Sequence, residues 1–244
     1  MKKVTSFVLI IATVFIIPLS SCAQPNPHIL SVKKGNYYQL IKMSLMPNEE
    51  SKALLDDYFM KIGPAMMASK AKVYSFGVME ASTGNGPAQM FMIAEYADKT
   101  KPDLIFKSEA FLKNRNQRDH ALSYLNEGYF LATQDGEFDL SKGELRLISL
   151  WVKEGKEEQL NTYFENVMPD AIKKGAISSP FVFVPDPSVP GKNYNASMLF
   201  LAAWQTQKNE EKFYSGKIFK EHVSERDDAL QFLEEYKIAF MPEQ

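Results

Sequence analysis

Apolar and polar residues along this chain follow two periodic patterns that recur in the same order in each half. Residues 38–45 and 145–152 alternate with a period of two, which predicts half-buried β-strands. Residues 51–69 and 157–174 place apolar side chains at helical spacing, which predicts amphipathic helices. Two further strands are expected after each helix, at 73–81 and 89–96 in the first half and at 181–184 and 197–204 in the second.

A second helical region is expected to close each half. Its apolar positions are Phe111, Ala121, Leu122 and Leu125 in the first half and Phe219, Ala229, Leu230 and Leu233 in the second. A short last strand is expected near 129–132 and 238–240. The order strand, helix, strand, strand, helix, strand predicts an α+β fold made of two tandem ferredoxin-like (βαββαβ) repeats.

Sequence matches between the halves support this interpretation, because they stay in register. Leu40 and Tyr58 have counterparts 105 residues later, in Leu145 and Tyr163. The segment 118–125 matches the segment 226–233, which lies 108 residues later. We therefore expect an internal duplication, with a first repeat at 36–134, a linker at 135–142 and a second repeat at 143–244.

The amino terminus has the features of an export signal. Lys2 and Lys3 precede an apolar run at 7–18, which is shorter than the roughly 20 residues that span a bilayer. Leu19-Ser20-Ser21-Cys22 follows and resembles the bacterial lipobox, at which a lipoprotein is lipidated on cysteine and cleaved. The resemblance implies a signal peptide at 1–21 and a lipidated tether at 22–35. It places the chain in the cell envelope, held by Cys22 at a membrane that we expect to be the outer one, facing the periplasm or the cell surface.

Composition narrows the range of partners. The formal net charge is −2 and the basic residues form no stripe, so nucleic acid is not an expected partner. Cys22 is the only cysteine, which excludes an internal disulfide. The exported part of the chain is therefore expected to be stabilised by its hydrophobic core.

The layout of two ferredoxin-like units resembles the dimeric α+β barrel superfamily, which includes antibiotic-biosynthesis monooxygenases and stress-responsive barrel proteins. The resemblance implies that the two repeats pack sheet to sheet as an intramolecular barrel, so we expect a monomer with an internal pseudo-dimer. It also implies a cavity between the halves that could hold a small organic ligand or haem. Some members are enzymes without a bound cofactor, and the fold alone does not assign a function.

The two faces of the first strand of each repeat differ in polarity. Ile41 and Met43, like Ile148 and Leu150, belong to an apolar face that helices are expected to cover. The opposite face is mixed and is expected to line the cavity, together with two aromatic residues at equivalent positions. The alternative is that these aromatic residues only fill the interface between the halves. The expected lining residues are Lys42, Ser44, Tyr96, Ser149, Trp151 and Trp204.

Few residues suggest catalysis. Glu95 is not kept in the second repeat, and a strand carboxylate with a raised pKa can act as a base. His120 and His222 could bind iron or transfer protons, although a histidine on a helix surface is more common. The pairs Arg118-Asp119 and Arg226-Asp227 occur in both repeats and are therefore expected to be scaffold contacts.

Three hypotheses for the function remain, and neither a cofactor nor a ligand is specified. The first is a lipid-anchored protein that binds a small apolar or aromatic molecule between its two halves. The second is a monooxygenase-like enzyme, either cofactor-independent or haem-linked, with a carboxylate or histidine inside the cavity. The third is a structural or partner-binding envelope protein with a filled barrel.

Overall fold

Strands from both halves of the chain close into one barrel in the computed structural model, which describes residues 28–81, 88–176, 181–185 and 194–241. The strand order is β10-β3-β4-β2-β5-β8-β9-β7, with every neighbouring pair antiparallel. The first repeat supplies β2 (Tyr37–Leu45), β3 (Lys72–Ala81), β4 (Met90–Tyr96) and β5 (Leu122–Ala132). The second supplies β7 (Glu144–Val152), β8 (Phe181–Pro185), β9 (Met198–Trp204) and β10 (Leu230–Met241).

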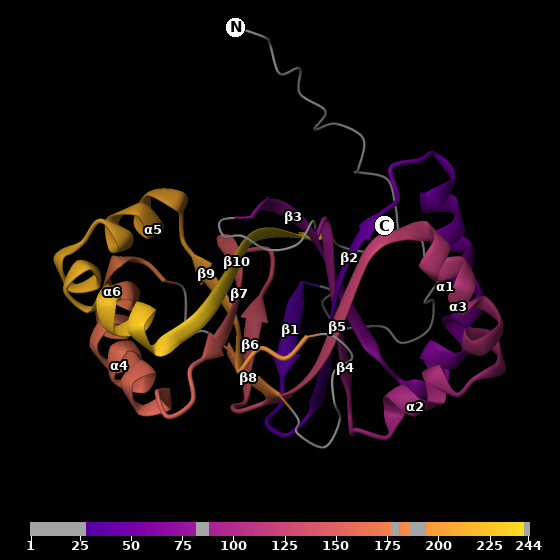
Figure 1. Cartoon of the computed structure of the whole chain (residues 1–244), viewed down its shortest axis with the longest axis horizontal. Coiled ribbons are helices and arrows are strands. Elements are labelled where there is room, and N and C mark those ends of the chain that lie inside the picture. The colour runs from indigo at the N-terminus through magenta and orange to yellow at the C-terminus, as the bar shows by residue number, and fades with distance from the viewer. Residues whose placement is uncertain (1–27, 82–87, 177–180, 186–193, 242–244) are drawn as a thin grey trace, which may run out of the picture.

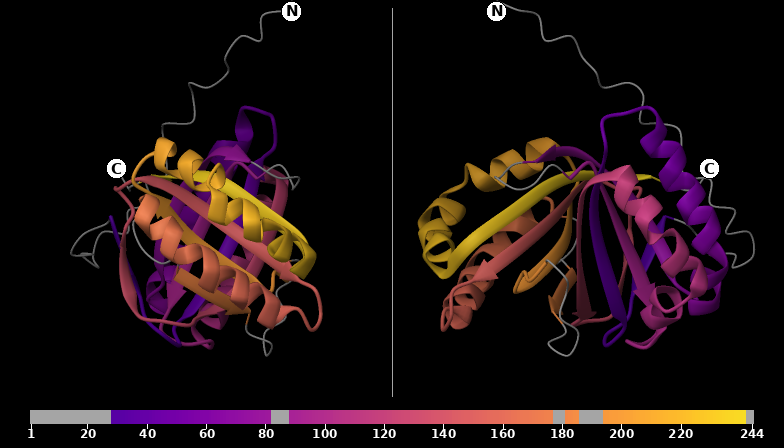
Figure 2. Two further views of the ribbon diagram at one scale, coloured as in Figure 1. Left: turned by 90° about the vertical axis from the view of Figure 1, so that its left-hand side faces the viewer. Right: turned by 45° about the vertical axis from the view of Figure 1, so that its right-hand side comes forward.

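The helices lie outside the barrel, in one group for each repeat and on opposite sides of the molecule (Figures 1 and 2). The first group consists of α1 (Glu50–Ser69), α2 (Lys101–Phe106) and α3 (Glu109–Ala121). The second consists of α4 (Glu157–Lys174), α5 (Gln207–Tyr214) and α6 (Lys217–Ala229). Among the residues that the structure describes, no helix combines the length and apolar character needed to cross a bilayer.

Two seams join the repeats into a closed barrel. Strand β3 pairs with β10, and β5 pairs with β8. Both edge strands of the first repeat are thus hydrogen-bonded to the edge strands of the second. Closure leaves none of these barrel strands with an unpaired edge, which removes the risk of strand addition from another chain. The expected fold, two ferredoxin-like repeats forming an intramolecular α+β barrel, is confirmed.

The last strand of each repeat is longer than the sequence pattern predicted. Strand β5 begins at Leu122 and β10 at Leu230, both of which were expected to be helical. The backbone of Leu122 is extended, with φ −110° and ψ 130°. The spacing of Leu122 and Leu125 fits a helix, but α3 ends at Ala121 and the residues that follow pair with β2.

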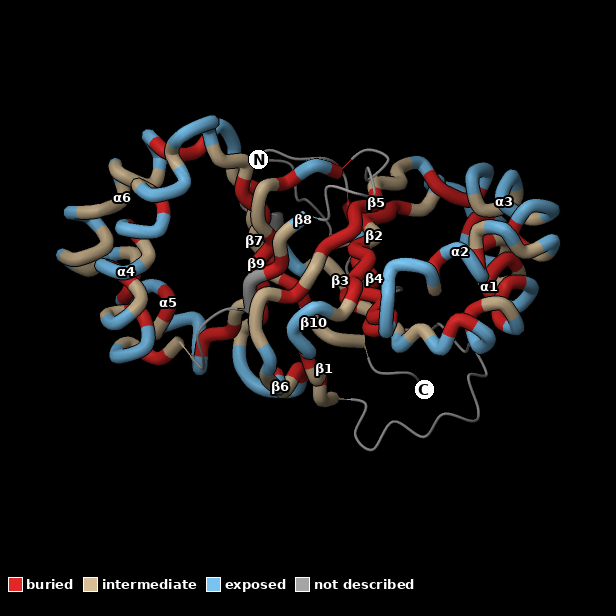
Figure 3. Tube along the Cα trace, turned by 90° about the horizontal axis from the view of Figure 1, so that it is seen from below, coloured by how far each residue is buried: buried red, intermediate tan, exposed pale blue. Residues whose placement is uncertain are grey.

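A small additional sheet lies where the sequence predicted a tether and a linker. Strand β1 (Ile29–Val32) pairs with β6 (Gly136–Asp139), and neither strand was expected. Leu30 and Phe138 belong to the core cluster that fills the barrel interior. Seen from below, buried residues gather in the central strands, between the two groups of helices (Figure 3). These segments are ordered because their alternate residues are apolar, and the folded part of the chain therefore begins before residue 36.

The strand registers refine the correspondence between the repeats. Tyr37 pairs with Tyr96, whereas Glu144 pairs with Trp204, the counterpart of Tyr96. Glu144 is therefore the structural counterpart of Tyr37, and β2 corresponds to β7 at an offset of 107 rather than 105. The shift of two residues leaves each side chain on the expected face, because side chains along a strand alternate with a period of two.

Candidate functional site

The space between the two sheets is packed with side chains. A core cluster from both repeats fills it, including Phe76, Phe130 and Phe183. Lys42 and Ser149, two of the expected lining residues, do point into this interior, where they belong to a buried polar cluster described below. Leu30 and Val32 of strand β1 belong to the same cluster, and the expected ligand cavity between the halves stays a prediction.

In each repeat, one cavity lies between the sheet and the helices that cover it. Cavity 1, in the first repeat, has a volume of about 60 Å³, and cavity 2, in the second, has a volume of about 100 Å³. Their walls are built from structurally equivalent residues, so the duplication produced two related sites. The shared pairs include Ile41 and Ile148, Tyr58 and Tyr163, Tyr96 and Trp204, Phe106 and Tyr214, Arg118 and Arg226, and Glu127 and Glu235.

Tyr96 and Trp204 line these cavities and do not face the barrel interior. Each lies on the strand face that packs against helices, with Tyr96 in the core cluster of α1 and Trp204 in that of α4. Their neighbours one residue earlier in the strands, Glu95 and Ala203, lie on the opposite face. Both aromatic residues were thus assigned to the wrong face. Ser44 shares the inner face of β2 with Lys42, and Trp151 packs against the interior cluster.

The polar end of cavity 1 is a closed network of hydrogen bonds. Tyr96 donates its hydroxyl hydrogen to Gln39 Oε1 at 3.0 Å. Gln39 Nε2 donates to Glu127 Oε2 at 2.9 Å. The neutral Gln39 amide therefore satisfies both the tyrosine and the carboxylate. Burial raises the pKa of Tyr58, on the opposite wall, to about 12, with Arg118 acting against the shift.

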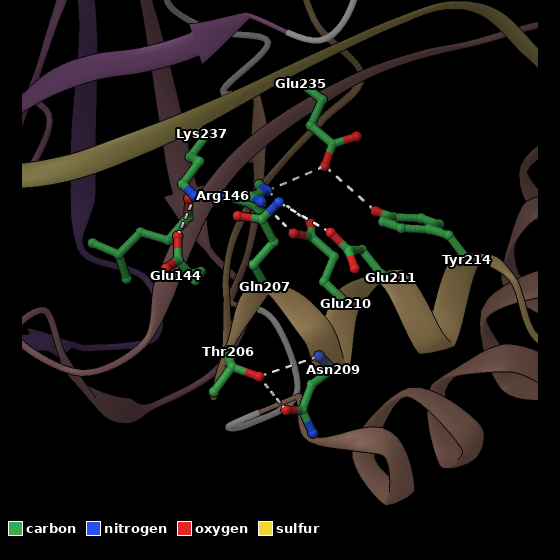
Figure 4. A network of polar contacts seen from close by, with 11 residues as sticks. Glu144, Arg146, Thr206, Gln207, Asn209, Glu210, Glu211, Tyr214, Glu235 and Lys237 are labelled. Carbon is green, nitrogen blue, oxygen red and sulfur yellow. Dashed lines mark hydrogen bonds and ion pairs between the residues drawn. The ribbon is translucent and has the colours of Figure 1, made fainter.

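The polar end of cavity 2 is charged (Figure 4). Arg146 takes the place of Gln39 and binds Glu210 of α5 through two contacts, of which Nε to Oε1 measures 2.8 Å. Glu235, the counterpart of Glu127, lies 3.7 Å from Arg146 Nε and accepts a 3.4 Å hydrogen bond from the Tyr214 hydroxyl. The buried Glu210 and the partly buried Glu235 thus share one guanidinium group, and only Glu235 reaches the cavity wall.

The electrostatics of this network follow from its burial. Loss of hydration raises the pKa of Glu235, and the neighbouring Glu210 raises it further, while Arg146 acts in the opposite direction. Burial also raises the pKa of Glu210, against the effect of Arg146. A carboxyl group of this kind holds a proton more readily than an exposed one, so Glu235 can accept a proton or a hydrogen bond from a molecule in cavity 2.

The residues first suggested for catalysis lie away from both cavities. Glu95 accepts a hydrogen bond from Asn36 at 2.8 Å and lies 3.6 Å from Lys72 Nζ. His120 is exposed at the end of α3, and His222 contacts Glu225 at 3.1 Å on the surface of α6. None of the three side chains lines cavity 1 or cavity 2, and a catalytic role for any of them stays a prediction.

Haem does not fit the cavities. The wall of neither cavity contains a histidine, and volumes of about 60 and 100 Å³ are too small for a porphyrin. In the described part of the chain no group of three metal-ligating side chains occurs either. No step of a mechanism is therefore assigned to haem or to a metal.

Glu235 and Arg146 were not found from the sequence. A signal was present, because Glu127 and Glu235 share the offset of 108 that relates the Arg118 and Arg226 segments. Arg146 was hidden, because the offset of 105 pairs it with Ile41 rather than with Gln39. The two arginines expected to be scaffold contacts do bind their neighbouring aspartates at 2.7 Å, but they also line the cavities. Cys22 lies outside the described residues.

Comparison with known proteins identifies the fold of this chain but not its family or its activity. No family model matches the sequence, and no curated protein is significantly similar to it. An anthrone oxidase-like protein is 9% identical with a TM-score of 0.58, covering 88% of this chain and 96% of its own. A proposed monooxygenase from Fusobacterium nucleatum is 10% identical with a TM-score of 0.52, covering 86% and 94%.

A mutant chlorite dismutase from Candidatus Nitrospira defluvii is similar to the same extent, at 7% identity and a TM-score of 0.52, covering 86% of this chain and 92% of its own. Identities this low show that the fold is shared, and they carry no information about activity. The chain has the α+β barrel fold found in monooxygenase-like and chlorite dismutase-like proteins.

Proposed function

We propose that this protein binds a small aromatic molecule bearing a hydrogen-bond donor, in cavity 2 between the sheet and the helices of the second repeat. The observation that carries the proposal is the cavity wall, in which Trp204, Phe213 and Tyr163 form an apolar surround and Glu235 supplies an acceptor at one end. Apolar walls with a few polar groups are typical of small-molecule sites. The volume of about 100 Å³ is smaller than the cavity of about 150 Å³ that accommodates benzene, so a substituted ring requires wall side chains such as the flexible Met168 to move outward.

One difference between equivalent wall residues favours the larger volume of cavity 2. Ala171 of α4 lines cavity 2, whereas its counterpart in α1, Met66, lines cavity 1. Both residues are buried, so the difference between their side-chain volumes changes the volume of the cavity directly. Replacing a methionine by alanine removes several heavy atoms from the wall and leaves space that the surrounding structure fills only in part.

The same proposal includes attachment to a membrane of the cell envelope through lipid on Cys22. Its support is the order of Lys2 and Lys3, the apolar run and the lipobox-like Leu19-Ser20-Ser21-Cys22. Two or three acyl chains would hold the protein firmly, because each buried methylene contributes about 0.8 kcal/mol. With strand β1 beginning at Ile29, the barrel would stand close to the membrane surface.

A binding experiment tests the site, with p-cresol as the probe and Trp204 as the reporter. In a Trp151→Phe background, Trp204 is the only tryptophan, so p-cresol in cavity 2 should change its fluorescence saturably. Ala171→Met should abolish the change by filling the cavity, whereas Ala68→Met, at an exposed site on α1, should not. Mass spectrometry of the protein from its own host should show a lipidated Cys22 and a co-purifying small molecule. An unlipidated apo protein that binds no p-cresol would contradict both parts.

A second function, cofactor-independent oxidation of the bound molecule, is favoured by the position of Glu235. Transfer of a phenolic proton to the Glu235 carboxylate would break the ligand O–H bond and leave an electron-rich phenolate. With hydroquinone, transfer of two electrons and two protons in all to one dioxygen molecule would give benzoquinone and hydrogen peroxide. The anthrone oxidase-like and monooxygenase neighbours make this reaction class worth testing on the same samples. Oxygen uptake with hydroquinone above the buffer rate, lost in Glu235→Gln, would assign an enzyme.

A further inference from the structure

An ion pair between the two repeats lies inside the barrel. Lys42 Nζ, from β2 of the first repeat, is 2.5 Å from Glu234 Oε2, from β10 of the second. The two side chains are 1% and 7% exposed. The Tyr194 hydroxyl donates to Glu234 Oε2 at 3.0 Å and also contacts Ser149. The ammonium group lies 4.5 Å from the centre of the Tyr194 ring, which adds a cation–π contact.

The duplication did not keep this pair. The offset of 107 between β2 and β7 makes Ser149 the counterpart of Lys42, and the offset of 108 makes Asn126 the counterpart of Glu234. In the strand registers Lys42 lies beside Asn126, and Ser149 lies beside Glu234. The inner face of the first sheet thus carries the cation, and the inner face of the second carries the anion.

This arrangement has a consequence for which sheets can pair. If the first repeats of two chains closed a barrel together, two Lys42 ammonium groups would be buried with Asn126 as their strand neighbour. If the second repeats did so, two Glu234 carboxylates would be buried with Ser149. Burying a charge without an opposite partner is strongly unfavourable, whereas a matched pair with added hydrogen bonds recovers much of that cost.

We propose that the Lys42–Glu234 pair makes the first repeat accept only the second repeat as its partner, and so excludes barrels formed between like repeats of two copies of this chain. The inner face of the first sheet also carries Glu95, which is already bound by Asn36 and Lys72. The two inner faces are otherwise mainly apolar and share the same architecture, which would allow like repeats to pair. A single buried polar contact can select one assembly over others of similar packing. The internal duplication is thereby directed to a closed monomer.

The test separates pairing specificity from stability. The full chain with Cys22→Ser is unfolded in denaturant, refolded and examined by native mass spectrometry and thermal unfolding, as wild type, Lys42→Met, Glu234→Gln and the double variant. Each single variant should lose thermal stability, because one buried charge has no partner. The double variant should regain most of the unfolding midpoint yet form dimers on refolding, because its neutral interior no longer discriminates.

The control is Lys113→Met, which breaks an exposed pair with Glu109 on α3 and should refold to monomer only. The double variant remains informative even if both single variants fail to fold. Dimers that appear in the double variant and not in wild type or control would support the proposal. A double variant that refolds entirely to monomer would overturn it, since the ion pair would then play no part in partner choice.

Discussion

Cavities 1 and 2 have mainly apolar walls built from equivalent positions, and they differ in their polar ends. In cavity 1 the neutral Gln39 links Tyr96 to Glu127, and the carboxylate is held by an amide. In cavity 2 Arg146 stands at the equivalent position but is bound mainly by Glu210, which leaves Glu235 at the wall with longer contacts. The comparison shows that one scaffold holds two sites that differ in charge and volume.

The largest expected effect comes from removing the cation of cavity 2. Arg146→Met would leave Glu210 and Glu235 buried without their shared partner, and breaking a buried pair in this way costs about 3–5 kcal/mol. Gln39→Met in cavity 1 removes only a neutral hydrogen-bonding group and should cost about 1–3 kcal/mol. Denaturant unfolding of the two variants measures the difference between these losses in unfolding free energy. Adding Glu210→Gln to Arg146→Met should recover part of the unfolding free energy that Arg146→Met loses. Equal losses in Arg146→Met and Gln39→Met would mean that the polar ends of the two cavities do not differ in their contribution to stability.

Much of the fold could be predicted from the sequence because its signals are local and repeated. The period of two in β2 and β7 and the helical spacing in α1 and α4 correctly assigned which face meets the helices. The match of the repeats predicted the barrel. The extended start of β5 was missed because Leu122 and Leu125 also fit a helix, and β1 was missed because its partner β6 lies more than a hundred residues away.

The site was less predictable, because it depends on register and on the third dimension. An offset of 105 fits the matched residues of α1 and α4, but α4 has 18 residues against 20 in α1 while the connections before both helices are equally long, so β2 and β7 correspond at 107. That difference hid the equivalence of Gln39 and Arg146. The assignment of Tyr96 to the barrel interior failed for another reason: aromatic character shows that a residue is buried but not which of two faces buries it.

A smaller effect should come from the residues that set cavity size. Met66→Ala places in cavity 1 the residue that cavity 2 has at the equivalent position, Ala171. Deleting a buried methionine side chain costs about 2–5 kcal/mol, at the low end where the site can collapse. Calorimetry should show p-cresol raising the unfolding midpoint of Met66→Ala more than that of wild type, because the ligand fills the new space. No gain from p-cresol would mean that the polar end, and not volume, distinguishes the cavities.

The smallest effect is a dependence of stability on pH that originates in cavity 2. Burial and the neighbouring Glu210 raise the pKa of Glu235 above the ordinary value of 4.5, so the folded state holds this proton more tightly than the unfolded state. As the pH rises from 4.5 through the raised pKa, the unfolded chain releases the proton first, and the free energy of unfolding falls. Glu235→Gln removes this contribution, so its unfolding free energy should fall less than that of wild type over that interval. Denaturant unfolding at a series of pH values measures both curves, with Glu109→Gln, at an exposed site on α3, as the control that should follow wild type. If the Glu235→Gln curve ran parallel to wild type, Glu235 would titrate alike in the folded and unfolded chains, and its burial beside Glu210 would have no effect on how tightly it holds a proton.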